Sequence, residues 1–326
     1  MQSSRPFTSV VRYVCPFFLL LLLGTGCDIV SSSGDTPQFV DSTSSDAGLE
    51  FDDSPGWHRK SVEHDNETRS FKYFVPNSLP SDAPVVMALH GATIGMDAMF
   101  AERRQGSQEW LEIAEEEGVL IVVPNASHDT QPVWNDCTPL PDRGTPDDAG
   151  FLVELTDWTT TRADVGADSV FIYGVSNGGQ MANRLAVEHP DRYAGIAAFI
   201  SNINSNLGPN EECSMPSSPI KTLIVSGRSD STTPFDGGGA DVWGVELLST
   251  PGTRDLWVDN NVQGDPPPRQ TNPHTEDNSG VTCEITPAPD TGADVQLCAF
   301  DGGHRVPADI SRFESTRVTW QFFRDR

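Results

Sequence analysis

One pentapeptide constrains the fold of this chain more than any other segment. Gly174-Val175-Ser176-Asn177-Gly178 follows directly after the β-type run Val170-Phe171-Ile172-Tyr173. A G-x-S-x-G between a buried strand and a helix is typical of a tight turn that exposes a nucleophilic serine at the carboxyl end of a sheet. Small neighbours are needed because the turn is strained. Since composition alone produces the pattern in about one chain in ten of this size, the rest of the sequence must supply companions for Ser176.

Short apolar runs alternate with amphipathic segments along the rest of the chain. The pattern predicts strands at 69–75, 84–89, 119–123, 169–173, 194–200 and 222–225, and a hairpin at 281–300. It predicts helices at 96–117, 149–163, 179–188 and 254–260, and a C-terminal helix with a stripe of Ile310, Phe313, Trp320 and Phe323. Strands that alternate with helices predict an α/β fold, with a mostly parallel sheet covered on both faces. We expect one catalytic domain over residues 54–326, without a repeat or a second domain.

The N-terminal segment resembles an export signal. Arg5 and Arg12 supply positive charge, residues 17–23 form a short apolar run, and Gly24-Thr25-Gly26 precedes Cys27. The ending resembles the lipobox of bacterial lipoproteins, in which the cysteine is lipidated, although Gly24 stands where leucine is usual. We expect a signal peptide at 1–26 and lipidation at Cys27. Ordinary cleaved secretion and an uncleaved anchor remain open.

A polar segment follows the expected signal. Residues 31–53 are rich in Ser, Asp, Thr and Gly and contain few large apolar side chains. Such a composition buries too little surface to fold. We therefore expect a disordered tether at 27–53 and an extracytoplasmic protein, either secreted or anchored to the cell envelope.

The charge balance excludes some partners. The chain carries 47 Asp and Glu against 21 Lys and Arg, a formal net charge of −26. This acidity disfavours nucleic acids and anionic membranes as partners, and it suits solubility in a high-salt setting. We expect a monomer that contacts a membrane only through an N-terminal lipid.

The six cysteines fit an oxidising compartment. Cys15 lies in the expected signal and Cys27 at its end, which leaves four cysteines and three ways of pairing them. Cys283 and Cys298 flank the expected hairpin, so we favour the pairs Cys283–Cys298 and Cys137–Cys213. The spacing of His and Cys does not suggest zinc, and we expect no metal or cofactor.

A nucleophilic serine needs an acid and a base, which follow it in the chain order Ser, Asp or Glu, His on the fold that the pentapeptide indicates. Asp230 lies just after the apolar strand at 222–226 and can orient an imidazole. Its alternative role is an Asx turn. Asp236 and Asp241 lie further into the loop and are weaker candidates.

Seven histidines compete for the role of base. His304 follows a strand, comes after Asp230 in the chain, and is preceded by Gly302-Gly303, which permit a tight turn. The others lie in polar lead-ins, loops or helix ends, or before the serine: His58, His64, His90, His128, His189 and His274. We expect His304 to be the base, with His128 as a weak alternative.

Backbone amides should bind the oxyanion. The turn itself positions the amide of Asn177, and the loop after the strand at 84–89 should supply the second, from Ala92 or, as second choice, Thr93. We expect the His90 side chain to brace that loop rather than to transfer protons. Trp134 could line a pocket or lie buried beneath a disulfide loop.

At this point the chain resembles the secreted polyhydroxybutyrate depolymerase/feruloyl esterase family. The resemblance covers about residues 68–324 and rests on motifs in order: Leu89-His90-Gly91, Trp134-Asn135, Asp147-Asp148-Ala149-Gly150-Phe151, 174–182, Gly227 with Asp230 and 234–238, and Gly302-Gly303-His304. It implies an α/β-hydrolase fold with Ser176 as nucleophile, Asp230 as acid and His304 as base. Arg305-Val306-Pro307 departs from the family's usual aromatic-Pro pair, and the loop after Gly91 has fewer glycines than usual, which leaves the substrate open.

The resemblance and the residues together predict a carboxylic ester hydrolase that works through an acyl-enzyme. We expect it to remove feruloyl or acetyl groups from polysaccharide. A polyhydroxybutyrate depolymerase is the alternative, and a peptidase on the same fold is less favoured. From another class, an inactive hydrolase-like lipoprotein that binds glycans also remains open.

Overall fold

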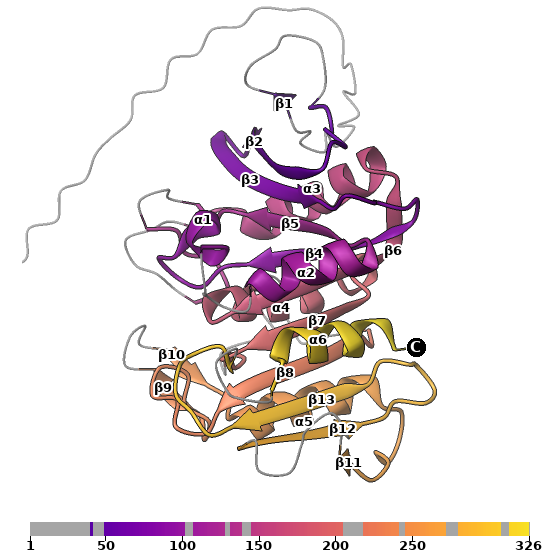
Figure 1. Cartoon of the computed structure of the whole chain (residues 1–326). Helices are drawn as coiled ribbons and strands as arrows, with labels where there is room; N and C mark the ends of the chain where they lie inside the picture. Colours follow the sequence, from indigo (N-terminus) through magenta and orange to yellow (C-terminus); the bar gives the residue numbers. More distant parts are fainter. Residues whose placement is uncertain are drawn as a thin grey trace, which may run out of the picture. The chain divides into compact units, whose positions relative to one another are not determined.

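A mixed β-sheet forms the centre of the fold (Figure 1). The computed structural model describes residues 40–41, 49–101, 107–127, 131–138, 145–204, 218–240, 245–271, 280–307 and 313–325. Within these residues the sheet has 11 strands in the order β1-β2-β3-β5-β4-β6-β7-β8-β13-β12-β11. The expected signal peptide at 1–26 and the expected lipidation site Cys27 lie outside the described residues.

Six adjacent strands at the centre of the sheet run parallel to one another. They are β5 (Leu120–Pro124), β4 (Ala83–Leu89), β6 (Val165–Val175), β7 (Gly195–Phe199), β8 (Lys221–Gly227) and β13 (Val295–Phe300). Apart from β6, whose first half is partly exposed, nearly all their residues are buried, as expected for parallel strands covered on both faces. The prediction of a mostly parallel sheet in an α/β fold is confirmed.

Antiparallel strands flank this parallel centre. One edge carries β1 (Val40–Asp41), β2 (Gly56–His64) and β3 (Glu67–Val75), and the other carries β12 (Val281–Thr286) and β11 (Gln270–Thr271). A separate two-stranded ribbon pairs β9 (Gly238–Ala240) with β10 (Val245–Leu247). β3 alternates between buried and partly exposed residues, which is the pattern of a strand with one face in the core.

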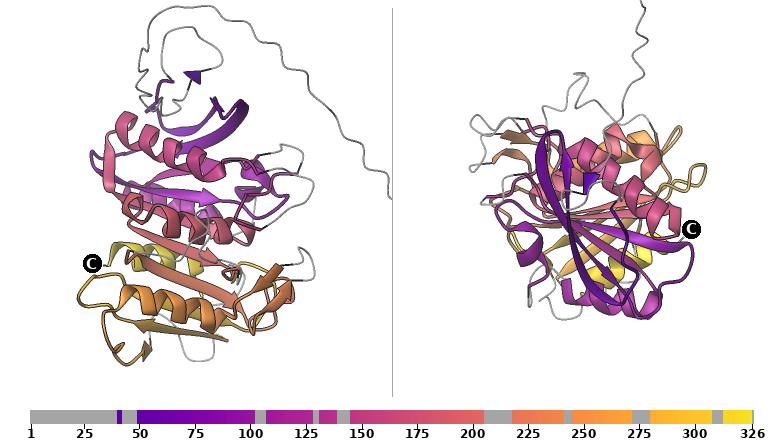
Figure 2. Two further views of the ribbon diagram at one scale, coloured as in Figure 1. Left: turned by 180° about the vertical axis from the view of Figure 1, so that it is seen from behind. Right: turned by 90° about the horizontal axis from the view of Figure 1, so that it is seen from above.

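Helices cover both faces of the sheet (Figures 1 and 2). One face carries α1 (Gly95–Met99), α2 (Ser107–Glu117) and α6 (Ser315–Arg324), whose apolar side chains share one core cluster. The other face carries α3 (Asp148–Arg162), α4 (Asn177–Glu188) and α5 (Thr250–Asn261), which build the second core cluster. A 3-10 turn, η1 (Pro190–Arg192), follows α4. None of the described helices has the length and apolar character needed to cross a bilayer.

Three expected helices differ from the observed ones. The helix expected at 96–117 is wrong as one piece, because α1 already ends at its cap Phe100 and α2 begins at Ser107. The helix expected at 254–260 starts earlier, since the Ser249 side chain caps it by accepting a hydrogen bond from the Gly252 amide. The C-terminal helix begins at Ser315, so Phe313 packs in the core just before it, and Ile310 lies outside the described residues.

The folded domain begins before residue 54, which corrects the end of the expected tether. Leu49 is buried, and its carbonyl oxygen accepts a hydrogen bond of 3.1 Å from Trp158 Nε1. Phe51 stacks on Tyr73 with ring centroids 4.8 Å apart. These apolar side chains anchor residues 49–53 to the sheet although the sequence around them is polar.

The hairpin of β12 and β13 carries the disulfide Cys283–Cys298, as predicted. The two cysteines lie directly opposite each other in the antiparallel register, with Cα atoms 4.0 Å apart. Cys137 is also disulfide-bonded. Its expected partner, Cys213, lies outside the described residues.

Candidate active site

Ser176 lies in a sharp turn between β6 and α4. Its backbone has φ of 55° and ψ of −121°, a strained conformation for a residue with a side chain. The Ser176 amide donates to Phe199 O on the neighbouring strand β7, at 2.9 Å. A Cβ atom at Gly174 would lie 2.2 Å from Gly178 O, so the turn requires glycine there. The strand–turn–helix that the pentapeptide predicts is therefore present.

The side chain of His304 reaches the serine. Ser176 Oγ and His304 Nε2 are 2.9 Å apart. His304 lies in the loop after β13, and a quarter of its side chain is exposed, so the imidazole is reachable from solvent. A serine hydroxyl at this distance can donate its proton to the imidazole.

Asp230 contacts the other nitrogen of the same imidazole. Asp230 Oδ2 and His304 Nδ1 are 2.8 Å apart, and the carboxylate is buried. Its Oδ1 accepts hydrogen bonds from the amides of Thr232 and Thr233, at 2.8 and 2.9 Å. Burial acts to raise the pKa of Asp230, but the hydrogen bonds from His304 and Thr233 outweigh it and hold the pKa below its usual value. The same carboxylate thus accepts the turn amides through Oδ1 and contacts the His304 imidazole and the Thr233 hydroxyl through Oδ2.

The sheet topology explains why residues so far apart in the chain meet. Ser176 follows β6, Asp230 follows β8, and His304 follows β13. These strands are parallel members of one sheet, so their carboxyl ends lie along the same edge. The geometry brings together the three residues that the chain order singled out.

The loop after β4 passes directly beside the serine. A Cβ atom at Gly91 would lie 3.5 Å from Ser176 Cβ, and Ala92 is the next residue of this loop. Among the described residues, the backbone amides of Ala92 and Asn177 donate to no protein acceptor. The amide of Thr93, the second choice, already donates to Pro132 O at 2.7 Å. Of the three amides considered, those of Ala92 and Asn177 are thus the two without a protein acceptor among the described residues.

His90 is fully buried beneath this loop. Its Nδ1–H donates to Gly91 O at 2.9 Å, and its Nε2 accepts from the Ala126 amide at 3.1 Å. Burial lowers the pKa of His90 to about 4, so the ring is neutral at pH 7. This arrangement fits the expected bracing role, because both ring nitrogens are engaged by backbone.

The remaining candidates lie elsewhere. His58 and His64 are on β2, and His189 caps the end of α4. Asp236 is exposed in the loop beyond Asp230. His128, Asp241 and His274 lie outside the described residues.

Sequence reasoning missed a polar network behind the turn. Trp134 is fully buried, so it does not line a pocket, and its backbone is hydrogen-bonded to the Asn177 side chain. Asp136 is also buried and accepts a hydrogen bond from Asn177 Nδ2 at 2.9 Å. The dipeptide Trp134-Asn135 was a visible signal, but the sequence alone does not show what it contacts.

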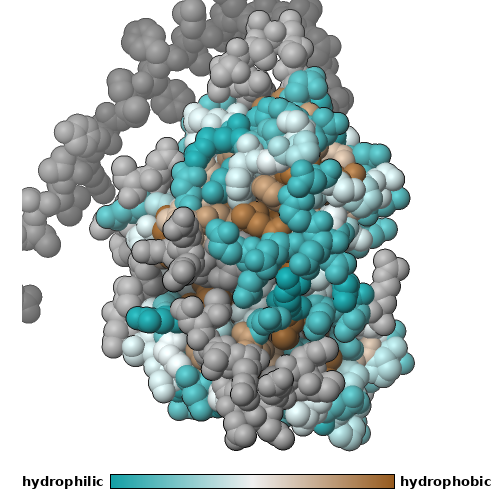
Figure 3. Space-filling model, viewed as in Figure 1, coloured by the Kyte–Doolittle hydropathy of each residue, from teal (hydrophilic) through white to brown (hydrophobic). Residues whose placement is uncertain are grey.

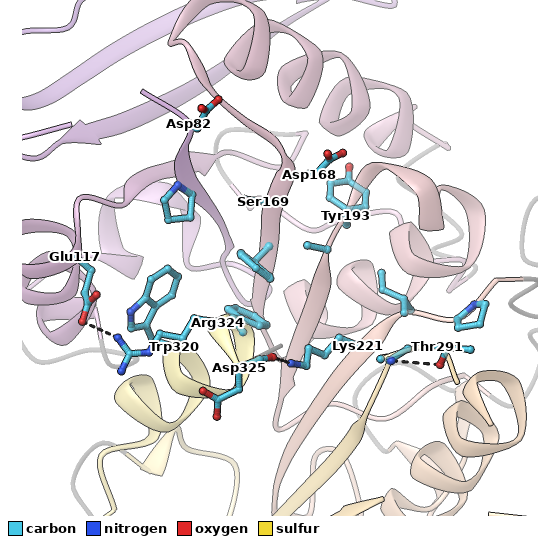
Figure 4. A pocket seen from close by; sticks show the side chains of 18 residues that line it. Asp82, Glu117, Asp168, Ser169, Tyr193, Lys221, Thr291, Trp320, Arg324 and Asp325 are labelled. Atoms are coloured by element: carbon cyan, nitrogen blue, oxygen red, sulfur yellow. Dashed lines mark hydrogen bonds and ion pairs between the residues drawn. The ribbon is translucent and has the colours of Figure 1, made fainter. Parts of the chain in front are cut away.

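A cavity of about 820 Å³ lies at the opposite edge of the sheet, at the amino ends of β4, β6 and β8 (Figure 4). Its two basic side chains already have partners: Arg324 pairs with Glu117 at 2.9 Å, and Lys221 Nζ donates to the carbonyl oxygen of Asp325. It is separate from Ser176. The described residues contain no group of three or more His, Cys, Asp or Glu side chains placed to bind a metal ion.

Comparison with known proteins points to esterases. No family model matches the chain. Over 163 residues it is 34% identical to the NocK protein of Nocardia uniformis subsp. tsuyamanensis, which is named as an esterase, with 49% of this chain and 44% of that protein covered. Over 160 residues it is 27% identical to feruloyl esterase B of Thermothelomyces thermophilus, with 48% and 53% covered. The chain thus spans about half the length of the curated relatives it matches.

Solved structures agree with the sequence relatives. An acetyl xylan esterase from Aspergillus awamori superimposes with a TM-score of 0.54 at 17% identity, over 78% of this chain and 93% of that one. At this identity the likeness shows a shared fold. The α/β-hydrolase fold is confirmed, and so is the resemblance to esterases that the motifs indicated.

Proposed function

We propose that this chain is a serine carboxylic ester hydrolase with Ser176 as nucleophile, His304 as base and Asp230 as acid. The observation that carries the proposal is the continuous hydrogen-bonded series from Ser176 Oγ to His304 Nε2, at 2.9 Å, and from His304 Nδ1 to Asp230 Oδ2, at 2.8 Å. The relatives named as esterases support the reaction class.

In the first half of the reaction, Ser176 Oγ attacks the ester carbonyl while His304 Nε2 takes its proton. Asp230 holds Nδ1 protonated and stabilises the imidazolium that forms. The amides of Asn177 and Ala92 bind the oxyanion, next to the N-terminus of α4, whose dipole favours negative charge. His304 then protonates the departing alcohol, and an acyl group remains on Ser176.

In the second half, His304 removes a proton from water, which attacks the acyl-enzyme through a second tetrahedral intermediate. The acid leaves and the Ser176 hydroxyl is restored. A binding protein without activity would not need three residues in this geometry, so we disfavour an inactive glycan-binding role.

The test is substitution of Ser176. Ser176→Ala should abolish hydrolysis of p-nitrophenyl acetate while the far-UV circular dichroism spectrum and the melting temperature stay close to those of the wild type. Retained hydrolysis in the folded variant would contradict the proposal.

We further propose that the substrate is polysaccharide that carries acetyl or feruloyl esters. Relatives named feruloyl esterase and acetylxylan esterase support this class. The face that carries α2 and α6 is mostly hydrophilic, with small separate hydrophobic patches (Figure 3). Among the described residues, Trp57 is the one large hydrophobic side chain that is exposed, to 40%.

A substrate panel tests this choice. Wild-type protein should release acetate from acetylated xylan or ferulate from feruloyl methyl ester with a higher kcat/KM than it shows on hydroxybutyrate oligomers. The reverse ranking would assign the enzyme to polyesters. Ser176→Ala serves as the blank in every assay.

We also propose an extracytoplasmic location, with a lipid on Cys27. The buried disulfide Cys283–Cys298 supports an oxidising compartment. Metabolic labelling with palmitate should mark the wild type but not Cys27→Ala. Equal labelling, or none in either, would remove the lipid from the proposal.

A further inference from the structure

Trp134 lies between the two sides of the expected oxyanion site. On the side of the turn, the Trp134 amide donates to Asn177 Oδ1 at 2.8 Å, and Asn177 Nδ2 donates to the carbonyl oxygen of Trp134 at 3.2 Å. The Asn177 side chain therefore bonds the main chain of Trp134 through both its oxygen and its nitrogen. This matters because the backbone amide of the same residue, Asn177, is one of the two expected oxyanion donors.

The same tryptophan holds the loop that carries the second donor. Trp134 Nε1 donates to His90 O at 2.9 Å, two residues before Ala92. Its indole lies against the His90 imidazole, with ring centroids 4.9 Å apart. Next to it in the chain, Pro132 O accepts the Thr93 amide at 2.7 Å, one residue after Ala92. The loop is thus bonded to one short segment on both sides of its expected donor.

The segment around Trp134 is itself held firmly. Asp136 Oδ2 accepts Asn177 Nδ2 at 2.9 Å, and Asp136 Oδ1 accepts the Thr138 amide at 3.0 Å. The Asn135 amide donates to Asp148 Oδ2 at 2.7 Å, at the start of α3. Trp134 and Asp136 are buried, so no solvent competes for these hydrogen bonds.

We propose that Trp134 is a positioning residue that fixes the separation and direction of the two oxyanion donors, with Asp136 locking the Asn177 side chain to it. The inference rests on the proposed ester hydrolysis and names how the same site is held. Oxyanion donors must lie within hydrogen-bond reach of an oxygen that becomes charged only in the transition state. Loosening them therefore reduces transition-state binding while leaving substrate binding nearly intact.

The test is Trp134→Phe, which keeps an aromatic ring against His90 and removes the donor to His90 O. We expect kcat to fall between about 10- and 100-fold, with KM changed by less than about twofold. A trifluoromethyl ketone that forms a hemiketal on Ser176 places an oxyanion in the same site. Its affinity should fall by the same factor as kcat/KM, which a loss of general stability would not produce.

Trp158→Phe is the matched control. Trp158 is also buried in the core, and its Nε1 likewise donates to a backbone carbonyl oxygen, that of Leu49, at 3.1 Å. It contacts Leu49 and Phe51, which precede β2, rather than the oxyanion loops. We expect a comparable loss of melting temperature with kcat and ketone affinity within about twofold of the wild type.

Asp136→Asn provides a second variant of nearly unchanged size, which keeps the tryptophan. It should show the same selective loss of kcat and of ketone affinity. Wild-type kcat and ketone affinity in either folded variant, or equal losses in Trp158→Phe, would overturn the inference. If instead the wild type neither hydrolyses esters nor binds the ketone, the proposed function fails and the positioning role falls with it.

Discussion

Gly178 lies against the carboxyl end of β4, so closely that a Cβ atom there would be 2.3 Å from Leu89 O and 2.6 Å from His90 O. The contact joins the start of α4 to the strand that leads into the oxyanion loop. The second glycine of the pentapeptide is therefore required by packing between two elements. The first glycine, Gly174, is required by the turn itself.

Gly178→Ala should destabilise the fold and impair catalysis. The clashing atoms belong to the backbone and cannot rotate away. We therefore expect the free energy of unfolding to fall by about 1–3 kcal/mol, and kcat to fall as well. Gly239→Ala is the control, because a Cβ atom there meets nothing within 4 Å. Urea unfolding of both variants measures the difference. Equal stability of the two would show that Gly178 does not have this close contact.

Asp230→Asn should lower kcat by about 10³- to 10⁴-fold without unfolding the protein, because an amide no longer holds the imidazole in the required tautomer. The exposed Asp236, further along the same loop, provides the control Asp236→Asn, which should retain activity. Steady-state kinetics on a p-nitrophenyl ester distinguishes the two. Loss of activity in Asp236→Asn, with Asp230→Asn unaffected, would reassign the acid.

An ion-pair cluster around the buried His64 predicts a pH-dependent part of the stability. His64 Nδ1 contacts Glu154 Oε2 at 2.9 Å, and His64 Nε2 contacts Asp147 Oδ2 at 3.2 Å. Burial acts to lower the pKa of His64, but hydrogen bonds to Asp147 and Glu154 outweigh it and raise the pKa above 6.5. The hydrogen bond from His64 lowers the pKa of Asp147 from 3.8 to about 2.

These shifts set a window in which His64 stabilises the fold. The raised pKa of His64 contributes stability in full below pH 6.5, and this is lost as the pH rises through the folded-state pKa. The lowered pKa of Asp147 contributes above pH 3.8, and this is lost as the pH falls towards 2. His64→Gln should therefore cost about 1–3 kcal/mol at pH 5 and clearly less at pH 9. A cost independent of pH, measured by urea unfolding with His189→Gln as control, would contradict the charged state of His64.

The disulfide of the β12–β13 hairpin should stabilise the strand that leads to His304. Cys283 and Cys298 are separated by 15 residues, and closing a loop of that size contributes about 3 kcal/mol through the unfolded state. The double variant Cys283→Ala/Cys298→Ala should lose about that much while keeping kcat at low temperature. Both cysteines are buried, so a reductant should not reduce the disulfide in the folded protein below the temperature at which unfolding begins. A melting temperature unchanged by the double substitution would contradict this role.

The sequence predicted the parts of this fold that depend on local pattern and chain order. Continuous apolar runs such as those before Ser176 and Asp230 are typical of strands buried on both faces, and parallel strands bring their carboxyl ends together. Ser176, Asp230 and His304 could therefore be selected before their distances were known. The hairpin disulfide followed from two cysteines placed symmetrically about a turn.

Contacts between polar side chains that are distant in the chain could not be predicted from apolar runs or from chain order. Nothing periodic connects Asp136 to Asn177, although the two side chains are hydrogen-bonded at 2.9 Å. Leu49 and Phe51 belong to the core in spite of a polar neighbourhood, because tertiary packing outweighs local composition. The end of α1 at Phe100 likewise has no proline or glycine at that position to indicate it in the sequence.

The central claim is that Ser176 is the nucleophile that His304 activates. A fluorophosphonate probe followed by peptide mass spectrometry measures this most directly. We predict a single phosphonate adduct on the peptide that contains Ser176, loss of ester hydrolysis in proportion to labelling, and no adduct in His304→Ala. An adduct on another residue, or full esterase activity in protein that carries the label on Ser176, would contradict the account.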